Sequence, residues 1–189
     1  MIEQLNMALF HLINQYAGMN PLVDATATLI AKYMPILFVI LLVYIWIRKD
    51  KGYKDIVLYS TYAAILGLII NSIIGLFYFH PRPFMIPIGT LLFSYPADSS
   101  FPSDHTTLLL SIAFIMTYFK QTRKLGILLI ILGLIEGLAR VFAGLHFPFD
   151  ILGSIGVSLI TSLLIYYFRD KLAPLNKMIR GTYSKIIRK

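Results

Sequence analysis

The 189-residue sequence contains no cysteine, and only 14% of its residues are charged. The missing cysteine excludes disulfides, thiolate metal sites and a cysteine nucleophile. Charged residues make up about a quarter of an ordinary soluble domain, so the low share argues against that class. Disorder is excluded too, because 58% of the chain is hydrophobic and includes 13 Phe and 12 Tyr. The composition therefore predicts an integral membrane protein.

Spanning helices are sought in the gaps between charges, because a helix needs about 20 mostly apolar residues to cross a bilayer. Five gaps qualify, within residues 24–48, 55–80, 106–119, 125–141 and 151–168. Residues 2–18 have apolar residues at helical spacing beside polar ones, which is typical of a helix lying in the membrane interface. We predict an all-α polytopic bundle of about five transmembrane helices with an N-terminal interfacial helix, forming one domain over residues 1–189; a sixth, tilted span at the N-terminus is the alternative.

Acidic residues are scarce, with 9 Asp and Glu against 17 Lys and Arg, and the net charge is +8. In a soluble protein this excess would suggest a nucleic-acid partner. Here, however, 14 of the 17 basic residues lie in the two loops 48–54 and 120–124 and in the tail 169–189, on one side of the five-span bundle. The positive-inside rule makes that side cytoplasmic. We therefore expect a multi-pass cell-membrane protein that binds membrane lipids and no nucleic acid, with the basic tail as a solvated or lipid-surface anchor.

Three short segments meet on the opposite, extracytoplasmic face: HPRPF (80–84), FPSDHTT (101–107) and ARVFAGLHFPFD (139–150). Ionisable residues near membrane depth are expensive and are usually functional. Two of them, Arg82 and Arg140, carry forks of donors matched to phosphate oxygens. Ser103 and Asp104 are typical of a helix N-cap, whose free amides also bind anions. The pattern predicts a phosphate site.

The same segments carry two histidines with one carboxylate partner. His146, oriented by Asp150 four residues later, is a candidate nucleophile toward phosphorus, and His105 is a candidate acid for the leaving oxygen. No cluster at metal-ligand spacing remains, so we expect neither a metal nor a cofactor. Glu136 precedes Arg140 by four residues, which places both on one helix face. We expect Glu136 to pair with Arg140 and to orient its guanidinium group toward the phosphate.

Each feature also has a purely structural interpretation. Arg82-Pro83 could be a snorkelling anchor and a helix stop, and the PSDH segment could be a turn with a cap. His146 and Asp150 could simply fix a loop. His80 and His11 are interpreted as structural or headgroup contacts. The ordered occurrence of the first three on one inferred face favours the functional interpretation.

Together the segments resemble the three-part signature of the type 2 phosphatidic acid phosphatase family, over residues 82–150: Arg82-Pro83, Pro102-Ser103-Asp104-His105, and Arg140 followed by His146 and Asp150. The short chain, the RPF end of the first motif and Asp104 in place of a common Gly resemble the bacterial undecaprenyl-diphosphatases linked to bacitracin resistance. Two positions depart from the family pattern. Gly75 stands where a Lys often opens the first motif, so a phosphate contact is absent or comes from Lys32 or His80. Ala139 stands where Ser often precedes the arginine.

The resemblance implies that His146 forms a phosphohistidine with Asp150 as partner, that His105 protonates the leaving group, and that the phosphate is held by Arg82, Arg140, Ser103 and the Asp104 backbone. It implies hydrolysis of undecaprenyl diphosphate to the monophosphate and inorganic phosphate on the outer leaflet, which recycles the cell-wall lipid carrier. The expected partner is this polyprenyl diphosphate, and no protein partner is expected. Alternatives are a phosphatase for phosphatidic acid or phosphatidylglycerol phosphate, and a non-catalytic anion-binding transporter.

Overall fold

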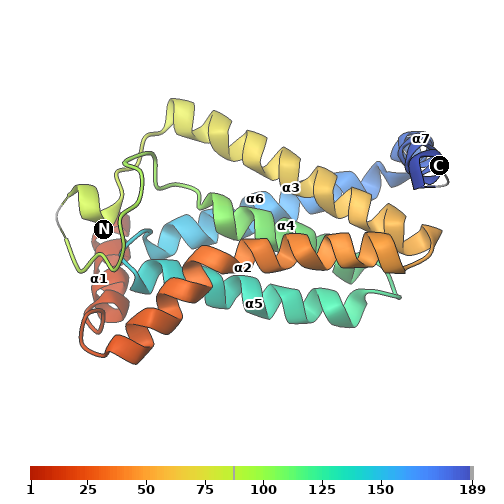
Figure 1. The fold of residues 1–189 in the computed structure, drawn as a ribbon. Helices are drawn as coiled ribbons and strands as arrows, with labels where there is room; N and C mark the ends of the chain where they lie inside the picture. The colour runs from red at the N-terminus through yellow and green to blue at the C-terminus, as the bar shows by residue number, and fades with distance from the viewer. Residues whose placement is uncertain (87, 188–189) are drawn as a thin grey trace.

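The structure is a computed structural model that describes residues 1–86 and 88–187, and all the regular elements of this part are helical. In chain order they are α1 (Ile2–Asn14), α2 (Pro21–Arg48), α3 (Lys51–Phe77), the short 3-10 helix η1 (Pro83–Met85), α4 (Asp104–Tyr118), α5 (Arg123–Phe142), α6 (Pro148–Tyr167) and α7 (Arg169–Ile187). Helices α2 to α6 form an elongated bundle, and α1 and α7 lie across its two ends (Figure 1). The predicted all-α membrane bundle is confirmed.

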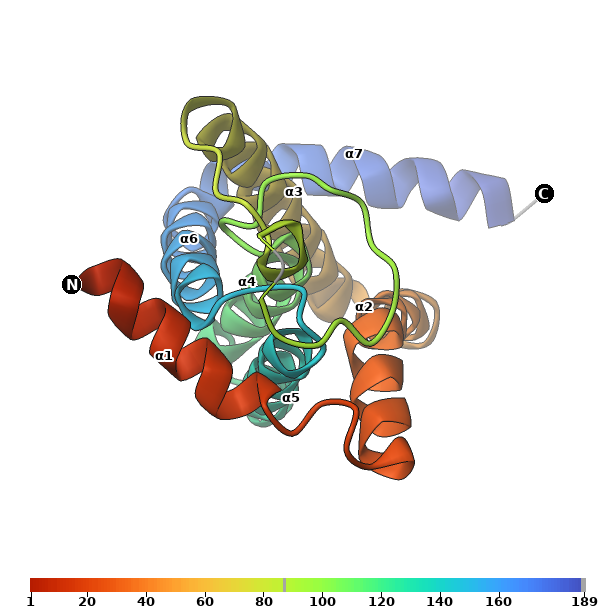
Figure 2. The same cartoon turned by 90° about the vertical axis from the view of Figure 1, so that its left-hand side faces the viewer.

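Four helices of the described chain, α2, α3, α5 and α6, are long and apolar enough to cross a membrane. The predicted third span corresponds to α4, which has only 15 residues. Figure 2 shows α4 near the middle of the bundle, where it contacts α3, α5 and α6. Leu109, Leu110, Ile115 and Met116 on α4 are fully buried. Because α4 faces other helices rather than lipid, its short length leaves little apolar surface mismatched to the bilayer.

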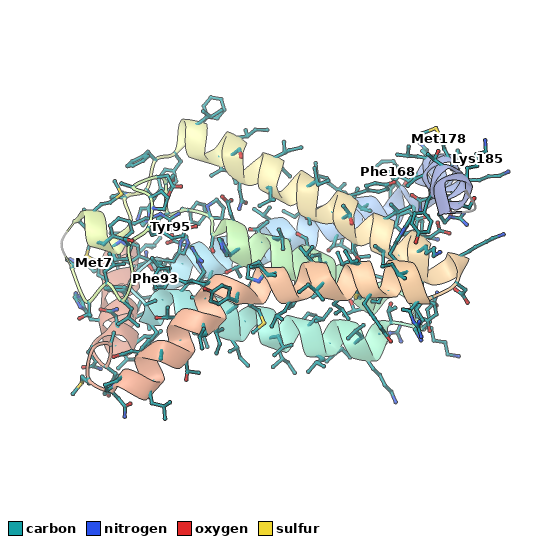
Figure 3. All side chains as sticks on the ribbon, in the orientation of Figure 1. Met7, Phe93, Tyr95, Phe168, Met178 and Lys185 are labelled. Atoms are coloured by element: carbon teal, nitrogen blue, oxygen red, sulfur yellow. The ribbon has the colours of Figure 1, made fainter. Side chains whose placement is uncertain are left out.

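The basic loops gather at one end of the bundle. The α2–α3 and α4–α5 connections lie at the end crossed by α7, and α1 and η1 lie at the other end (Figure 1). Figure 3 shows Lys185 and Met178 on α7 at the first end, which we call the basic end. Two of the fourteen basic residues, Arg188 and Lys189, lie outside the described residues. Charge is therefore separated along the bundle axis in the way that the sequence predicts.

Helix α1 crosses the opposite end, but its polar side chains do not all face outward. Ile2, Leu5 and Leu12 are exposed, whereas Asn6 and Asn14 are buried against the bundle. Asn6 Oδ1 accepts the Phe149 N–H at 3.0 Å, at the start of α6. Both asparagines belong to the polar residues of the interfacial pattern at 2–18. Their inward position follows from the unpaired backbone groups of the loops and helix ends beneath, which need partners when buried.

Asn14 holds together the two chain segments that frame the site. Its Nδ2 donates to Thr90 O at 2.8 Å and to Phe142 O at 2.7 Å, and its Oδ1 accepts the Thr90 N–H. Gly144, in the α5–α6 turn, has φ +79°, and a Cβ there would lie 2.4 Å from Thr90 O. Only glycine fits this left-handed, closely packed position. The turn that carries His146 is therefore locked against the long loop 78–103.

Candidate active site

His146 lies in the α5–α6 turn and Asp150 in the first turn of α6, so their spacing of four residues brings the side chains together. His146 Nδ1 is 3.3 Å from Asp150 Oδ2. The same oxygen accepts the Phe147 N–H at 2.7 Å and the Ser100 hydroxyl. Both side chains are buried. The carboxylate is thus held by backbone and side-chain donors and faces one particular nitrogen of the ring.

The partner of the other ring nitrogen determines the tautomer of His146. Arg82 Nη1 lies 2.9 Å from His146 Nε2. A guanidinium can only donate, so Nε2 is the acceptor and the single ring proton sits on Nδ1, where it is donated to Asp150. Burial, above all, lowers the pKa of His146 to about 4; the Asp150 hydrogen bond opposes this, and the charges of Arg140 and Arg82 reinforce it. The imidazole is therefore neutral at neutral pH, with its lone pair on Nε2.

Arg82 joins the first motif to the third. Its Nη1 also donates to Leu145 O at 3.0 Å, and its Nε forms an ion pair with Asp98 Oδ1 at 2.7 Å. The residues joined by these contacts are far apart in the chain, and the guanidinium is buried among them. An arginine that only anchored the chain at a headgroup would keep its charged end in water. The burial of Arg82 therefore argues against a snorkelling anchor.

Arg140 is held from two sides. Its Nη1 donates to Ala31 O at 3.1 Å, and its Nε lies 3.8 Å from Glu136 Oε1. Ala31 O is free to accept because the residue four positions later, Pro35 inside α2, has no N–H to donate to it. Arg140 Nη2 is buried and has no hydrogen-bond partner among residues 1–86 and 88–187. Buried donors normally find acceptors, so this nitrogen is suited to an anionic ligand.

The second motif begins α4. Ser103 is the N-cap, and its Oγ accepts the Thr106 N–H at 3.5 Å. Thr106 Oγ1 in turn donates to Glu136 Oε2 at 3.1 Å. The first turn of α4 is thereby connected to Glu136, the residue that forms the ion pair with Arg140. The Asp104 side chain turns away toward α3 and accepts from Asn71 Nδ2 at 2.9 Å. The anion-binding capacity of this segment therefore rests on the backbone amides of the first turn.

Tyr95, in the long loop, brings the rest of the cluster together. Its ring centroid is 4.6 Å from the Arg82 Cζ, 5.0 Å from the Arg140 Cζ and 6.4 Å from the centroid of the His105 ring. Figure 3 shows Tyr95 in the loop at the α1 end of the bundle. The three predicted segments therefore converge on one place, and an aromatic ring lies against both guanidinium groups.

Sequence reasoning missed four contributors: Tyr95, Ser100, Pro35 and the ion pair that His80 makes with Asp150. Ser100 donates to Asp150 across 50 residues, and no local pattern marks it. Pro35 carried a detectable signal, since a proline within an apolar helix frees a carbonyl four residues earlier. His80 lies 3.5 Å from Asp150 Oδ1, beside the carboxylate rather than among the phosphate donors.

The two departures from the family pattern have local consequences. Gly75 lines a cavity of about 130 Å³ together with Asp98, Ser99 and Asp104. The Lys32 ammonium lies 4.2 Å over the Phe93 ring. Ala139 packs in a small cluster with Ala27 and Ala31, so its small side chain allows α2 to approach α5 closely beside Arg140.

A neutral imidazole with a carboxylate partner, two buried guanidinium groups and a helix start form a site suited to phosphoryl transfer. Within the described ranges no group of three or more His, Asp and Glu side chains is arranged to hold a metal ion. Fold and site together define the class of a membrane-embedded lipid phosphatase.

Comparison with known proteins gives the family. Residues 56–174 match the model of the PAP2 superfamily, and the chain belongs to that superfamily. It is 36% identical over 185 residues to the undecaprenyl-diphosphatase BcrC of Bacillus subtilis, covering 98% of this chain and 95% of the relative. It is 29% identical to the bacitracin transport permease protein BcrC of Bacillus licheniformis, covering 97% and 90%. The crystal structure of Aquifex aeolicus LpxE superposes with a TM-score of 0.72 at 26% identity, covering 86% of this chain and 95% of that one.

Proposed function

We propose that the chain, as a single catalytic domain, hydrolyses undecaprenyl diphosphate to undecaprenyl phosphate and inorganic phosphate on the extracytoplasmic side of the cell membrane, and so recycles the cell-wall lipid carrier. The observation that carries the proposal is the His146 ring, whose proton is held on Nδ1 by Asp150 while Nε2 carries the lone pair. The B. subtilis relative, named for this substrate, supports the choice of lipid.

The reaction proceeds in two displacements. His146 Nε2 attacks the terminal phosphorus and an N–P bond forms, while the bond from phosphorus to the bridging oxygen breaks. His105, which takes up a proton as the anionic diphosphate binds beside it, gives that proton to the bridging oxygen, and the lipid monophosphate leaves. Water then attacks the phosphohistidine and gives its proton to His105, which releases inorganic phosphate and restores neutral His146.

The phosphate takes its donors from Arg82, Arg140, Ser103 and the backbone at Asp104. As it binds, Arg82 Nη1 turns from His146 Nε2 to a phosphate oxygen, which frees the lone pair for attack. In the complex the phosphate also satisfies the buried Arg140 Nη2.

A groove beside Arg140 suits the hydrocarbon tail. It has a volume of about 560 Å³, and it runs between α1, α2 and α5. Apolar side chains line it almost throughout: Ile13, Leu22, Val23, Ala27, Ile30, Leu138, Ala139 and Phe142, with Thr26. Because the groove includes Ala139, the neighbour of Arg140 on α5, a chain lying in it can place its diphosphate end at the guanidinium group.

The proposed activity is tested with purified protein in detergent. We expect phosphate release from undecaprenyl diphosphate, with a higher kcat/KM than for phosphatidic acid or phosphatidylglycerol phosphate. Activity should persist in EDTA, because no three His, Asp or Glu side chains of the described residues are grouped to bind a metal ion. Faster turnover of either phospholipid would assign a different lipid, restoration by magnesium after EDTA would exclude this mechanism, and no release from any of the three would favour a binding or transport role.

Sidedness can be tested in intact cells, since the chain has no native cysteine. Ala97 is exposed in the loop at the α1 end, and Gln121 is exposed at the basic end. We expect a membrane-impermeant maleimide to label Ala97→Cys and to leave Gln121→Cys unlabelled until the cells are permeabilised, because the basic end stays in the cytoplasm. The opposite pattern would place the site on the cytoplasmic side.

Replacing Pro35 tests how Arg140 is positioned. In Pro35→Ala the restored N–H competes for Ala31 O, to which Arg140 Nη1 now donates. We expect KM to rise roughly tenfold, since a hydrogen bond to a charged group contributes about 1.5–3 kcal/mol. Pro174→Ala, at a proline that also lies inside a described helix rather than at its first residue, is the matched control. Equal kinetics for the two variants would remove Pro35 from the argument.

Glu136→Gln tests the support behind the same arginine. Glu136 is fully buried between Thr106 and Arg140, and glutamine keeps its shape but removes the charge. We expect activity to fall roughly 10- to 100-fold, the range measured for residues that orient the ligands of metal sites. Circular dichroism and gel filtration should show an intact fold. A folded variant with wild-type kinetics would leave Glu136 only a charge-neutralising role.

A further inference from the structure

A third histidine lies next to the proposed catalytic pair. His80, in the loop after α3, has its Nδ1 3.5 Å from Asp150 Oδ1, and the side chain is only 12% exposed. Its ring lies edge-on to Phe147, with centroids 5.2 Å apart, and stacks on Tyr78 at 6.0 Å. Aromatic neighbours on two sides restrict the ring to one orientation.

The two oxygens of Asp150 have different surroundings. Oδ2 takes the donors already described, from His146, Ser100 and the Phe147 amide. Oδ1 is buried, and among the described residues it has no hydrogen-bond partner closer than the His80 ion pair. A fully buried carboxylate oxygen without a hydrogen-bond donor is costly. His80 is therefore the group that fixes the second oxygen.

His80 also faces a second acid. Its Nε2 lies 3.7 Å from Glu3 Oε1, on α1. A neutral imidazole has one N–H and can serve only one of two carboxylates, whereas an imidazolium has two. The position between Glu3 and Asp150 therefore favours the charged ring. Consistent with this, the Asp150 hydrogen bond raises the pKa of His80, against the effect of burial, and the charges of Asp150 and Glu3 add to the rise.

We propose that His80 is a positioning residue, which as an imidazolium holds the Asp150 carboxylate in the orientation that His146 requires, and that Glu3 of α1 keeps His80 charged. The inference rests on the proposed role of His146 as nucleophile. The proposal gives α1 a role in the reaction. Glu3 on α1 stabilises the positive charge of His80, and His80 contacts the proposed catalytic carboxylate of Asp150.

The direction of the His80 pKa shift predicts how kcat depends on pH. Because the pKa of His80 is raised, the ring stays protonated through neutral pH and loses one N–H only as the pH climbs through the raised value. Above that point Asp150 Oδ1 or Glu3 loses its donor, and kcat falls. The titratable side chains facing His80 are Glu3 from α1, Asp150 from α6 and Tyr78 from its own loop.

The first experiment compares two variants of His80. Asparagine carries its amide nitrogen near the position of Nδ1 and can still donate to Asp150, whereas leucine cannot. We expect His80→Leu to lower kcat roughly 10- to 100-fold with KM unchanged, and His80→Asn to recover most of that loss. His11→Asn, at an exposed histidine of α1, is the control. Equal kcat values for wild type and folded His80→Leu would overturn the proposal, and so would an equal loss in the leucine and asparagine variants.

The second experiment does not depend on turnover. Nitrogen NMR of histidine-labelled protein should give His80 a pKa above 6.5, and Glu3→Gln should lower it and move the alkaline fall of kcat to lower pH. Glu3 is half exposed, so this variant is expected to fold even if His80→Leu does not. An unchanged His80 pKa in Glu3→Gln would overturn the part given to α1. A fully active His146→Ala would instead contradict the proposed function, which keeps the two failures distinct.

Discussion

His146→Ala is expected to abolish phosphate release from the lipid diphosphate, with kcat lower by about 10⁶-fold, the size of the loss when a covalent nucleophile is removed from a protease. Among the described residues His146 is the imidazole with a carboxylate at Nδ1 and a guanidinium at Nε2. Stopped-assay phosphate release measures the loss. The wild-type protein, quenched in alkali during turnover of a labelled substrate, should carry phosphate on histidine, and the variant should carry none.

The matched control is His11→Ala, which removes an exposed histidine from the same end of the bundle and should keep wild-type rates. Gel filtration and thermal unfolding should show that both variants fold. Substantial turnover by a folded His146→Ala, or phosphate trapped on another residue, would show that the attack comes from elsewhere, such as His105 or water.

Asp150→Asn is expected to lower kcat by roughly 10³–10⁴-fold, as the corresponding change does in the Ser-His-Asp triad, where it stabilises the wrong tautomer. The Phe147 N–H and the Ser100 hydroxyl already occupy the side of the carboxylate that faces His146. They favour the amide oxygen there and leave its NH₂ directed toward His80, with only a weakened acceptor for His146 Nδ1. The opposite rotamer places an N–H against Nδ1, and the ring proton moves to Nε2, where it opposes both Arg82 and attack on phosphorus.

Asp24→Asn, at a carboxylate that accepts the Gly18 N–H near the start of α2, is the control for removal of one negative charge. Nitrogen NMR of His146 distinguishes the causes, because a change of tautomer exchanges the shifts of Nδ1 and Nε2. If Asp150→Asn kept near wild-type kcat, Asp150 would only fix the α5–α6 turn, which was the structural interpretation of the pair.

The local part of the site was predictable from spacing. His146 with Asp150 and Glu136 with Arg140 are each four residues apart, and in the structure both pairs are in contact. Helical geometry brings such side chains together whatever the rest of the fold does. The separation of charge along the bundle was equally readable, because each connecting loop must lie at one end or the other of its helices.

The convergence of the motifs needed the tertiary structure. Arg82 meets His146 across 64 residues, Ser100 meets Asp150 across 50, and Arg140 meets Ala31 across 109. These contacts depend on the path of the long loop, on the enclosed position of α4 and on the approach of α2 at its proline. By itself, the sequence determined which groups are chemically able to act and at which end of the bundle they lie. Only tertiary packing decided their partners, because an imidazole, a guanidinium or a carboxylate acquires its protonation state and direction from neighbours that chain distance does not specify.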